Sequence, residues 1–151
     1  MTRKEIVTNV QKYFDVRELV CTHVYTRFGE SSWQFLRTEL LANILFLREH
    51  IGKPFTVNTW HRNGKFDERG YRCNMCSIVR EKTKSMQLYV SAHTNGSAVD
   101  FDVQGMTAEE VRNVIRSVTL PYPARIERDV SWVHLDCYDY LNGKNLNEFN
   151  G

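Results

Sequence analysis

The sequence predicts one small domain of the α+β class, spanning residues 1–151 with its core at about residues 13–138. Three observations support this prediction. The length suits a single domain that can bury a core, and 42% hydrophobic with 25% charged residues is typical of globular proteins. Two segments show the apolar spacing of helices. Four short segments have the alternation or the β-branched composition of strands.

The clearest helix is predicted over residues 31–51. Ser31 or Ser32 is expected to cap its start, and Gly52 followed by Pro54 to end it. Its apolar positions recur at spacings of three and four, at Leu36, Leu40, Ile44 and Leu47. A second helix is expected from the capping box Thr107-Ala-Glu-Glu110 to about Val118.

The strands are predicted around these helices, over residues 55–60, 97–103, 124–128 and 130–137. A tight turn near Asp129 joins the last two. Residues 61–76 are polar, and a loop of this length in a small domain is usually functional or mobile. Residues 1–12 are expected to form a short helix or arm. The tail from Tyr138 is expected to be frayed.

Two of the predicted strands carry residues that could bind a metal. Asp100 points to the polar face of the strand 97–103, and His93 lies in the turn before it. In the strand 130–137, Trp132, His134 and Asp136 share one face. If the two strands pair, His134 can lie opposite Asp100. The set of His93, Asp100 and His134, with a fourth position open to water, is typical of a catalytic zinc site.

These residues resemble a known family. Residues 91–100 read S-A-H-T-N-G-S-A-V-D and match, position by position, the S-x-H-x-x-G-x-A-x-D motif of the M15 family of zinc peptidases. Residues 132–134 read W-V-H and resemble its second motif, W-x-H. The resemblance covers about residues 30–137. It implies that His93, Asp100 and His134 are zinc ligands.

The resemblance also implies a fold and an activity. The family shares with the Hedgehog signalling domain a small α+β fold, in which helices flank a mainly antiparallel sheet. Its members hydrolyse amide bonds of bacterial peptidoglycan stem peptides, as carboxypeptidases, dipeptidases or endopeptidases. We therefore expect a zinc metallopeptidase that takes a peptidoglycan peptide as its substrate.

Two further roles need candidates. The family's S-x-Y-R segment carries an arginine for the substrate carboxylate or carbonyl, and residues 59–62 read T-W-H-R, so Arg62 resembles that residue. Arg69 and Arg72 are alternatives.

Many family members place the general base three residues before the second histidine. Ser131 stands there in this sequence and cannot serve as a base. Asp129 is the first candidate, followed by Glu127 and Asp136. Asp136 could instead orient a metal ligand.

Charge and the N-terminus bear on partners and localisation. A net charge of +2 without a basic stripe argues against nucleic-acid binding, and no segment is apolar enough to insert in a membrane. We expect a monomer. The N-terminus lacks a signal-peptide pattern, so we expect synthesis in the cytoplasm and release to the cell wall only through other factors, such as phage lysis machinery.

Two other functions are considered beside the wall peptidase. The serine at position 131 favours a non-catalytic, zinc-containing binding module of the Hedgehog kind. A cytoplasmic D-Ala-D-Ala dipeptidase would differ from the wall enzyme only in substrate.

Cysteine spacing raises a separate possibility. Cys73 and Cys76 have the spacing of a zinc knuckle, and Cys21 with Cys137 could complete a set of four thiolates. The alternative is two small loop residues that stay reduced. The remaining histidines are expected to be structural or exposed, and these are His23, His50 and His61.

Overall fold

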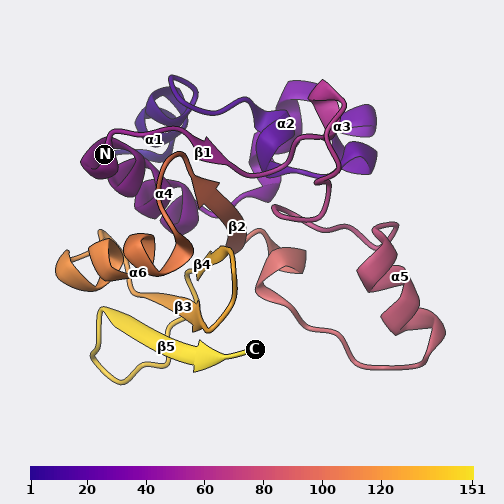
Figure 1. The fold of residues 1–151 in the computed structure, drawn as a ribbon. Coiled ribbons are helices and arrows are strands. Elements are labelled where there is room, and N and C mark those ends of the chain that lie inside the picture. The colour runs from indigo at the N-terminus through magenta and orange to yellow at the C-terminus, as the bar shows by residue number, and fades with distance from the viewer.

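A five-stranded sheet forms the centre of the computed structural model, which describes residues 1–151 (Figure 1). The strands lie in the order β1-β2-β4-β3-β5. The first three pairings are antiparallel, and β5 runs parallel to β3. The predicted α+β class with a mainly antiparallel sheet is thus confirmed. The strand bounds are β1 Phe55–Thr56, β2 Ala98–Val103, β3 Ala124–Arg128, β4 Val133–Asp136 and β5 Leu146–Asn150.

The chain also forms six α-helices and three 3-10 turns. None of the helices combines the length and the apolar character that crossing a membrane requires. Figure 1 shows α5 apart from the sheet, carried by the long segment between β1 and β2. The bounds are α1 Arg3–Val10, α2 Val16–Leu19, α3 Thr22–Phe28, η1 Gly29–Phe35, α4 Thr38–Ile51, η2 Trp60–Arg62, α5 Ser77–Lys84, η3 Ala92–Asn95 and α6 Ala108–Ser117.

The predicted helix over residues 31–51 begins later than expected. Residues 29–35 form a 3-10 turn, and α4 starts at Thr38 after Arg37, so the serines do not cap it. The reason is a contact with the S-x-H-x-x-G turn. The N–H of Arg37 donates to the carbonyl of Gly96 at 3.0 Å, and this bond holds Arg37 in an extended conformation. The predicted end of the helix at Gly52 is confirmed by its left-handed conformation, with φ 71°.

Two other predictions about elements are wrong. Only Phe55 and Thr56 of the segment 55–60 form a strand, because Trp60 already starts a 3-10 turn. The tail is not frayed, because Leu146–Asn150 pairs with the free edge of β3 over five positions. The capping box of α6 is confirmed, since the Thr107 side chain accepts from the N–H of Glu110.

One hydrophobic cluster joins α1, α4, α6 and the sheet. It includes Ile6 and Val10 of α1, so the core extends N-terminal to the predicted boundary at residue 13. Leu146 of β5 packs against the same cluster at the other end of the chain. Burying each such side chain stabilises the fold by about 1.5–3 kcal/mol. The cluster thereby fixes β2 and β4, the two strands that carry the candidate site.

Candidate metal centre

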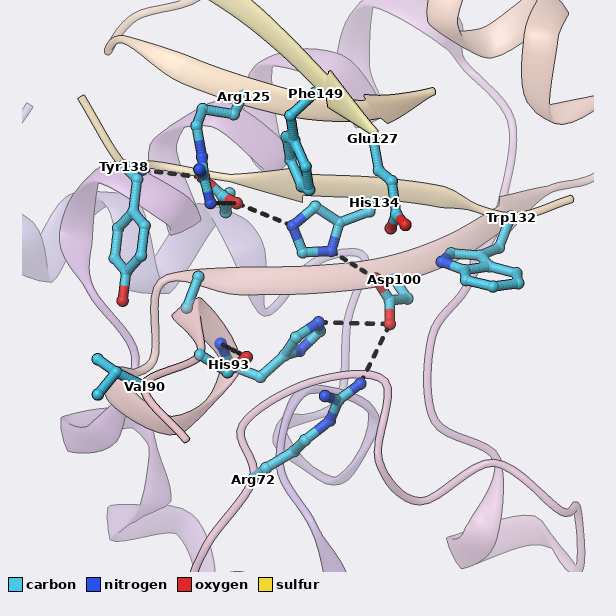
Figure 2. Close-up of a pocket in the computed structure, with 13 residues that line it drawn as sticks. Arg72, Val90, His93, Asp100, Arg125, Glu127, Trp132, His134, Tyr138 and Phe149 are labelled. Carbon is cyan, nitrogen blue, oxygen red and sulfur yellow. Dashed lines mark hydrogen bonds and ion pairs between the residues drawn. The ribbon is translucent and has the colours of Figure 1, made fainter. Parts of the chain in front are cut away.

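The three predicted ligands meet at the junction of η3, β2 and β4 (Figure 2). Asp100 pairs with His134 in the antiparallel register of β2 and β4, as the alternation predicted. The Nδ1 of His134 lies 2.8 Å from one oxygen of Asp100, and the Nε2 of His93 lies 3.3 Å from the other. All three side chains are buried. Their ligand atoms lie within 4.8 Å of one another, so the set can hold a metal ion.

These separations fit a small tetrahedral ion. Zinc binds nitrogen and oxygen ligands at about 2.0–2.2 Å, which places neighbouring ligand atoms about 3.3 Å apart. The separation between His93 and Asp100 equals that value. The separation between His134 and Asp100 is shorter because these two side chains form a hydrogen bond. In that bond a proton lies between the two ligand atoms, where a metal ion would otherwise bind. One imidazole on each side of a carboxylate is a donor set that suits zinc.

Each histidine is oriented by a hydrogen bond from its other ring nitrogen. The Nδ1 of His93 lies 2.9 Å from the carbonyl oxygen of Gly70. A carbonyl only accepts, so Nδ1 carries the hydrogen and Nε2 is left facing Asp100. The Nε2 of His134 lies 2.8 Å from Asp136, which leaves Nδ1 facing Asp100 in the same way. Such outer contacts fix the tautomer of a metal ligand and its ring orientation.

The protonation of the site reflects burial and these contacts. Burial alone would lower the pKa of His134, but its hydrogen bonds to Asp100 and Asp136 outweigh it and raise the pKa to about 9. Burial would raise the pKa of Asp100, but the hydrogen bond from His134 and the neighbouring His93 ring hold that pKa well below its usual range. Without a metal, the site therefore holds an imidazolium between two carboxylates. A cation in the site would compete with this proton.

Both carboxylate oxygens of Asp136 accept hydrogen bonds from other groups of the protein. It is wholly buried and accepts hydrogen bonds from Arg125 at 2.9 and 3.0 Å, from the N–H of Tyr138 at 3.0 Å and from His134. Burial would raise the pKa of Asp136, but the bonds from His134 and Arg125 lower it. A carboxylate with this many partners has no free position for a water molecule. This arrangement holds the His134 ring in place and fits the second of the two roles considered for Asp136, that of orienting a metal ligand.

The ligands open into a pocket of about 260 Å³. A neighbouring pocket of about 590 Å³ shares Arg72, Asp100 and Trp132 with it, so the two pockets adjoin at these residues, and together they are called the groove. Trp132 is 37% exposed and stands as a wall of the groove beside Asp100 (Figure 2).

Of the remaining carboxylates considered as bases, Glu127 lines this pocket and Asp129 does not. Ile126 pairs with Leu135, so the next position places Glu127 opposite His134. Figure 2 shows its carboxylate beside the His134 ring, and it accepts no hydrogen bond within the protein. Asp129 lies exposed in the turn after β3, with φ 59°.

The arginine nearest the ligands is Arg72. Its Nη2 lies 3.4 Å from Asp100, its Nη1 donates to the Tyr89 hydroxyl at 2.8 Å, and its Nε donates to the carbonyl of Glu68 at 2.6 Å. Arg62 is exposed at the end of η2 and lines no pocket with the ligands.

Arg69 lies in the neighbouring part of the groove and pairs with Asp102 at 2.9 Å. The sequence contained a signal for Arg72. Tyr71-Arg72 matches the last two positions of S-x-Y-R, whereas residues 61–62 match only the last.

Comparisons with known protein families, with curated proteins and with solved structures found no match to this chain. The chemical assignment of the site therefore rests on its own geometry. That geometry consists of three buried ligands, two oriented imidazoles, a free carboxylate and an arginine around one open groove.

Proposed function

We propose that this chain is a zinc-dependent peptidase that hydrolyses an amide bond of bacterial peptidoglycan stem peptides, as a carboxypeptidase or an endopeptidase. The observation that carries the proposal is the convergence of His93, Asp100 and His134 at the floor of a groove that also presents Glu127 and Arg72. The match of residues 91–100 and 132–134 to the zinc-peptidase motifs supports the substrate class.

The roles follow from the positions of the side chains. His93, Asp100 and His134 would hold the ion, which when bound would supply Lewis acidity to the scissile carbonyl and to a water molecule. The free carboxylate of Glu127 takes a proton from the attacking water and passes it to the leaving amine as the C–N bond breaks. Arg72 places its guanidinium where it can bind a substrate carboxylate or the oxyanion that develops.

The shape of the groove favours a wall peptide over a free dipeptide. The first pocket adjoins the larger one at Arg72 and Trp132, and the larger one is also lined by Lys65, Phe66 and Arg69 among others. A dipeptide would need only the first pocket. A stem peptide can reach both pockets, whose lining carries cations (Lys65, Arg72) and carboxylates (Asp67, Glu68, Asp102), so that both the carboxylates and the amino groups of such a peptide can find partners.

Digestion of purified peptidoglycan tests the proposal. The zinc-loaded protein should release new amino groups, lose this activity with a chelator and regain it when zinc is added back. His93→Ala should abolish release, whereas His50→Ala, at an exposed histidine that stacks on Phe46 away from the site, should leave it intact. If fully zinc-loaded protein releases no amino groups, or if His93→Ala is as active as the parent, the proposal is wrong.

Ser131 favours a second candidate, a non-catalytic zinc-bearing binding module, because it stands where many peptidases of the M15 family carry their base. Glu127→Gln separates the two candidates. A peptidase should lose turnover and keep its zinc, since Glu127 is not a ligand. Asp129→Asn is the matched control, because it removes a nearby carboxylate that does not line the pocket. Loss of activity in Asp129→Asn and not in Glu127→Gln would make Asp129 the base.

A further inference from the structure

A second group of metal-ligating side chains lies outside the groove. It consists of Cys21, His23, Cys73 and Cys76, whose ligand atoms lie within 4.8 Å of one another. From the cysteine spacing, Cys137 was the candidate to complete a set of four thiolates with Cys21, Cys73 and Cys76. That combination is wrong, because the chain after β4 is held at Ser97 by a backbone hydrogen bond of 3.0 Å and Cys137 is not part of the group. The fourth member is His23, which was expected to be structural or exposed.

The separations within this group fit a tetrahedral zinc ion. With Zn–S at about 2.3 Å and Zn–N at about 2.0–2.1 Å, two sulfurs lie about 3.8 Å apart and a sulfur and a nitrogen about 3.6 Å apart. The Sγ atoms of Cys73 and Cys76 are 4.0 Å apart. The Nδ1 of His23 lies 3.5 Å from the first and 3.9 Å from the second. A disulfide needs about 2.05 Å between its sulfurs, and all four cysteines of the chain are free.

The backbone brings the ligands together before any metal is needed. Val20 and Tyr71 form a parallel bridge, and the N–H of Tyr71 donates to the carbonyl of Leu19 at 2.9 Å. This pairing aligns the chain before Cys21 with the chain before Cys73. The Cys73–Cys76 segment turns back on itself through a 3.2 Å backbone bond, and the N–H of Met75 donates to the Cys73 sulfur at 3.3 Å. N–H donors of this kind stabilise a thiolate.

We propose that Cys21, His23, Cys73 and Cys76 bind a structural zinc ion with three thiolates and one imidazole. Four protein ligands close the coordination shell, so this site has no open position for a substrate. Cys21 and Cys76 are buried, whereas His23 is exposed and lies on the side from which an ion can enter.

This ion would restrain residues 69–72, the segment that supports the first metal centre. The backbone of residues 69–72 makes three hydrogen bonds to the strand and turn that carry its ligands. The carbonyl of Arg69 accepts from the N–H of Asp100 at 2.7 Å, the carbonyl of Gly70 accepts from His93, and the N–H of Arg72 donates to the carbonyl of His93 at 3.1 Å. Cys73 follows immediately. Any effect of this structural ion on peptidase turnover rests on the proposed function, but the binding of the ion does not.

Metal content per chain tests the proposal on the full-length protein. The parent should retain two zinc ions after dialysis, as measured by mass spectrometry of the metal. Cys73→Ser combined with Cys76→Ser should lose one ion, and His93→Ala combined with His134→Ala should lose the other. Cys137→Ser, the matched cysteine control, should retain both. The proposal would be overturned if the parent bound only one zinc ion per chain and the double cysteine variant retained that ion.

A cobalt titration covers the case in which the cysteine variant fails to fold. Here the variant His93→Ala with His134→Ala, whose thiolate group is intact, is titrated with cobalt alone. Thiolate-bound tetrahedral cobalt absorbs strongly in the visible, and this absorption should saturate at one ion per chain. Adding His23→Ala should weaken the binding at least tenfold, whereas adding His50→Ala should not change it. If no thiolate absorption develops, the structural site does not exist. If it develops while the zinc-loaded parent protein leaves peptidoglycan uncut, the peptidase proposal fails alone.

Discussion

The protonation of His134 gives a prediction about the metal-free protein. Its pKa is raised from the usual 6.5 to about 9 by Asp100 and Asp136, against the opposing effect of burial. A raised pKa in the folded state stabilises the fold fully below pH 6.5, and this contribution is lost as the pH rises through about 9. The carboxylates remain ionised throughout this window, so the change comes from the imidazole.

The magnitude follows from the size of the shift. Each pKa unit corresponds to about 1.4 kcal/mol, so the rise from 6.5 to about 9 is worth about 3 kcal/mol of unfolding free energy. The His134–Asp100 ion pair contributes to the unfolding free energy once, so the lowered pKa of Asp100 adds nothing further to this value. Bound zinc needs the neutral imidazole, so zinc should remove most of this pH dependence by displacing the proton.

The assay is urea unfolding of the metal-free, reduced protein at a series of pH values between 6 and 10. His134→Gln is the reference, because the thiols titrate equally in both proteins and cancel in the difference. The parent should exceed this variant by a margin that shrinks by about 3 kcal/mol across the window. NMR of the His134 ring protons should give the pKa directly. A ring that titrates near 6.5, or a margin that does not change with pH, would refute the reasoning.

Three further predictions concern single side chains. Asp136→Asn should weaken metal binding at the His93 site about 10–100-fold in competition with a chelator, because it removes the anion that orients His134; unchanged affinity would deny Asp136 that role. Glu127→Gln should lower kcat by about 10²–10⁴ at unchanged zinc content, and Asp129→Asn should not. Gly96→Ala should lower the unfolding free energy by more than about 2 kcal/mol, because a Cβ would meet the carbonyl of Phe35 and φ is 73°. Gly143→Ala is the control, because Gly143 also has a positive φ (78°) but open space around it, so this change should cost only backbone strain. Thermal or urea unfolding measures both variants. Equal losses of unfolding free energy would exclude the proposed clash with Phe35 at position 96.

Much of the fold and the ligand set could be predicted because those features are encoded locally. Side chains alternate along a strand with a period of two, so the pattern of residues 97–103 already placed Asp100 on the polar face. The same argument placed His134 on the matching face of its own strand, and the observed register pairs the two residues. The capping box at Thr107 is equally local, since its two hydrogen bonds join residues three apart.

Other features could not be predicted because they depend on where distant segments meet. The strand at Leu146–Asn150 forms only because the edge of β3 is free to accept it. Glu127 reaches the pocket through the pairing of β3 with β4, whereas Asp129, closer in sequence to His134, turns outward.

The long loop shows the same division between local and distant information. The sequence by itself determined that residues 61–76 are polar and carry arginines and a C-x-x-C pair. Only the tertiary structure decided that Arg72 rather than Arg62 faces Asp100, and that His23 rather than Cys137 joins the thiols. The physical reason is that residue spacing constrains neighbours a few positions apart, whereas the path of a loop is set by backbone pairing with a remote segment, here the bridge from Val20 to Tyr71.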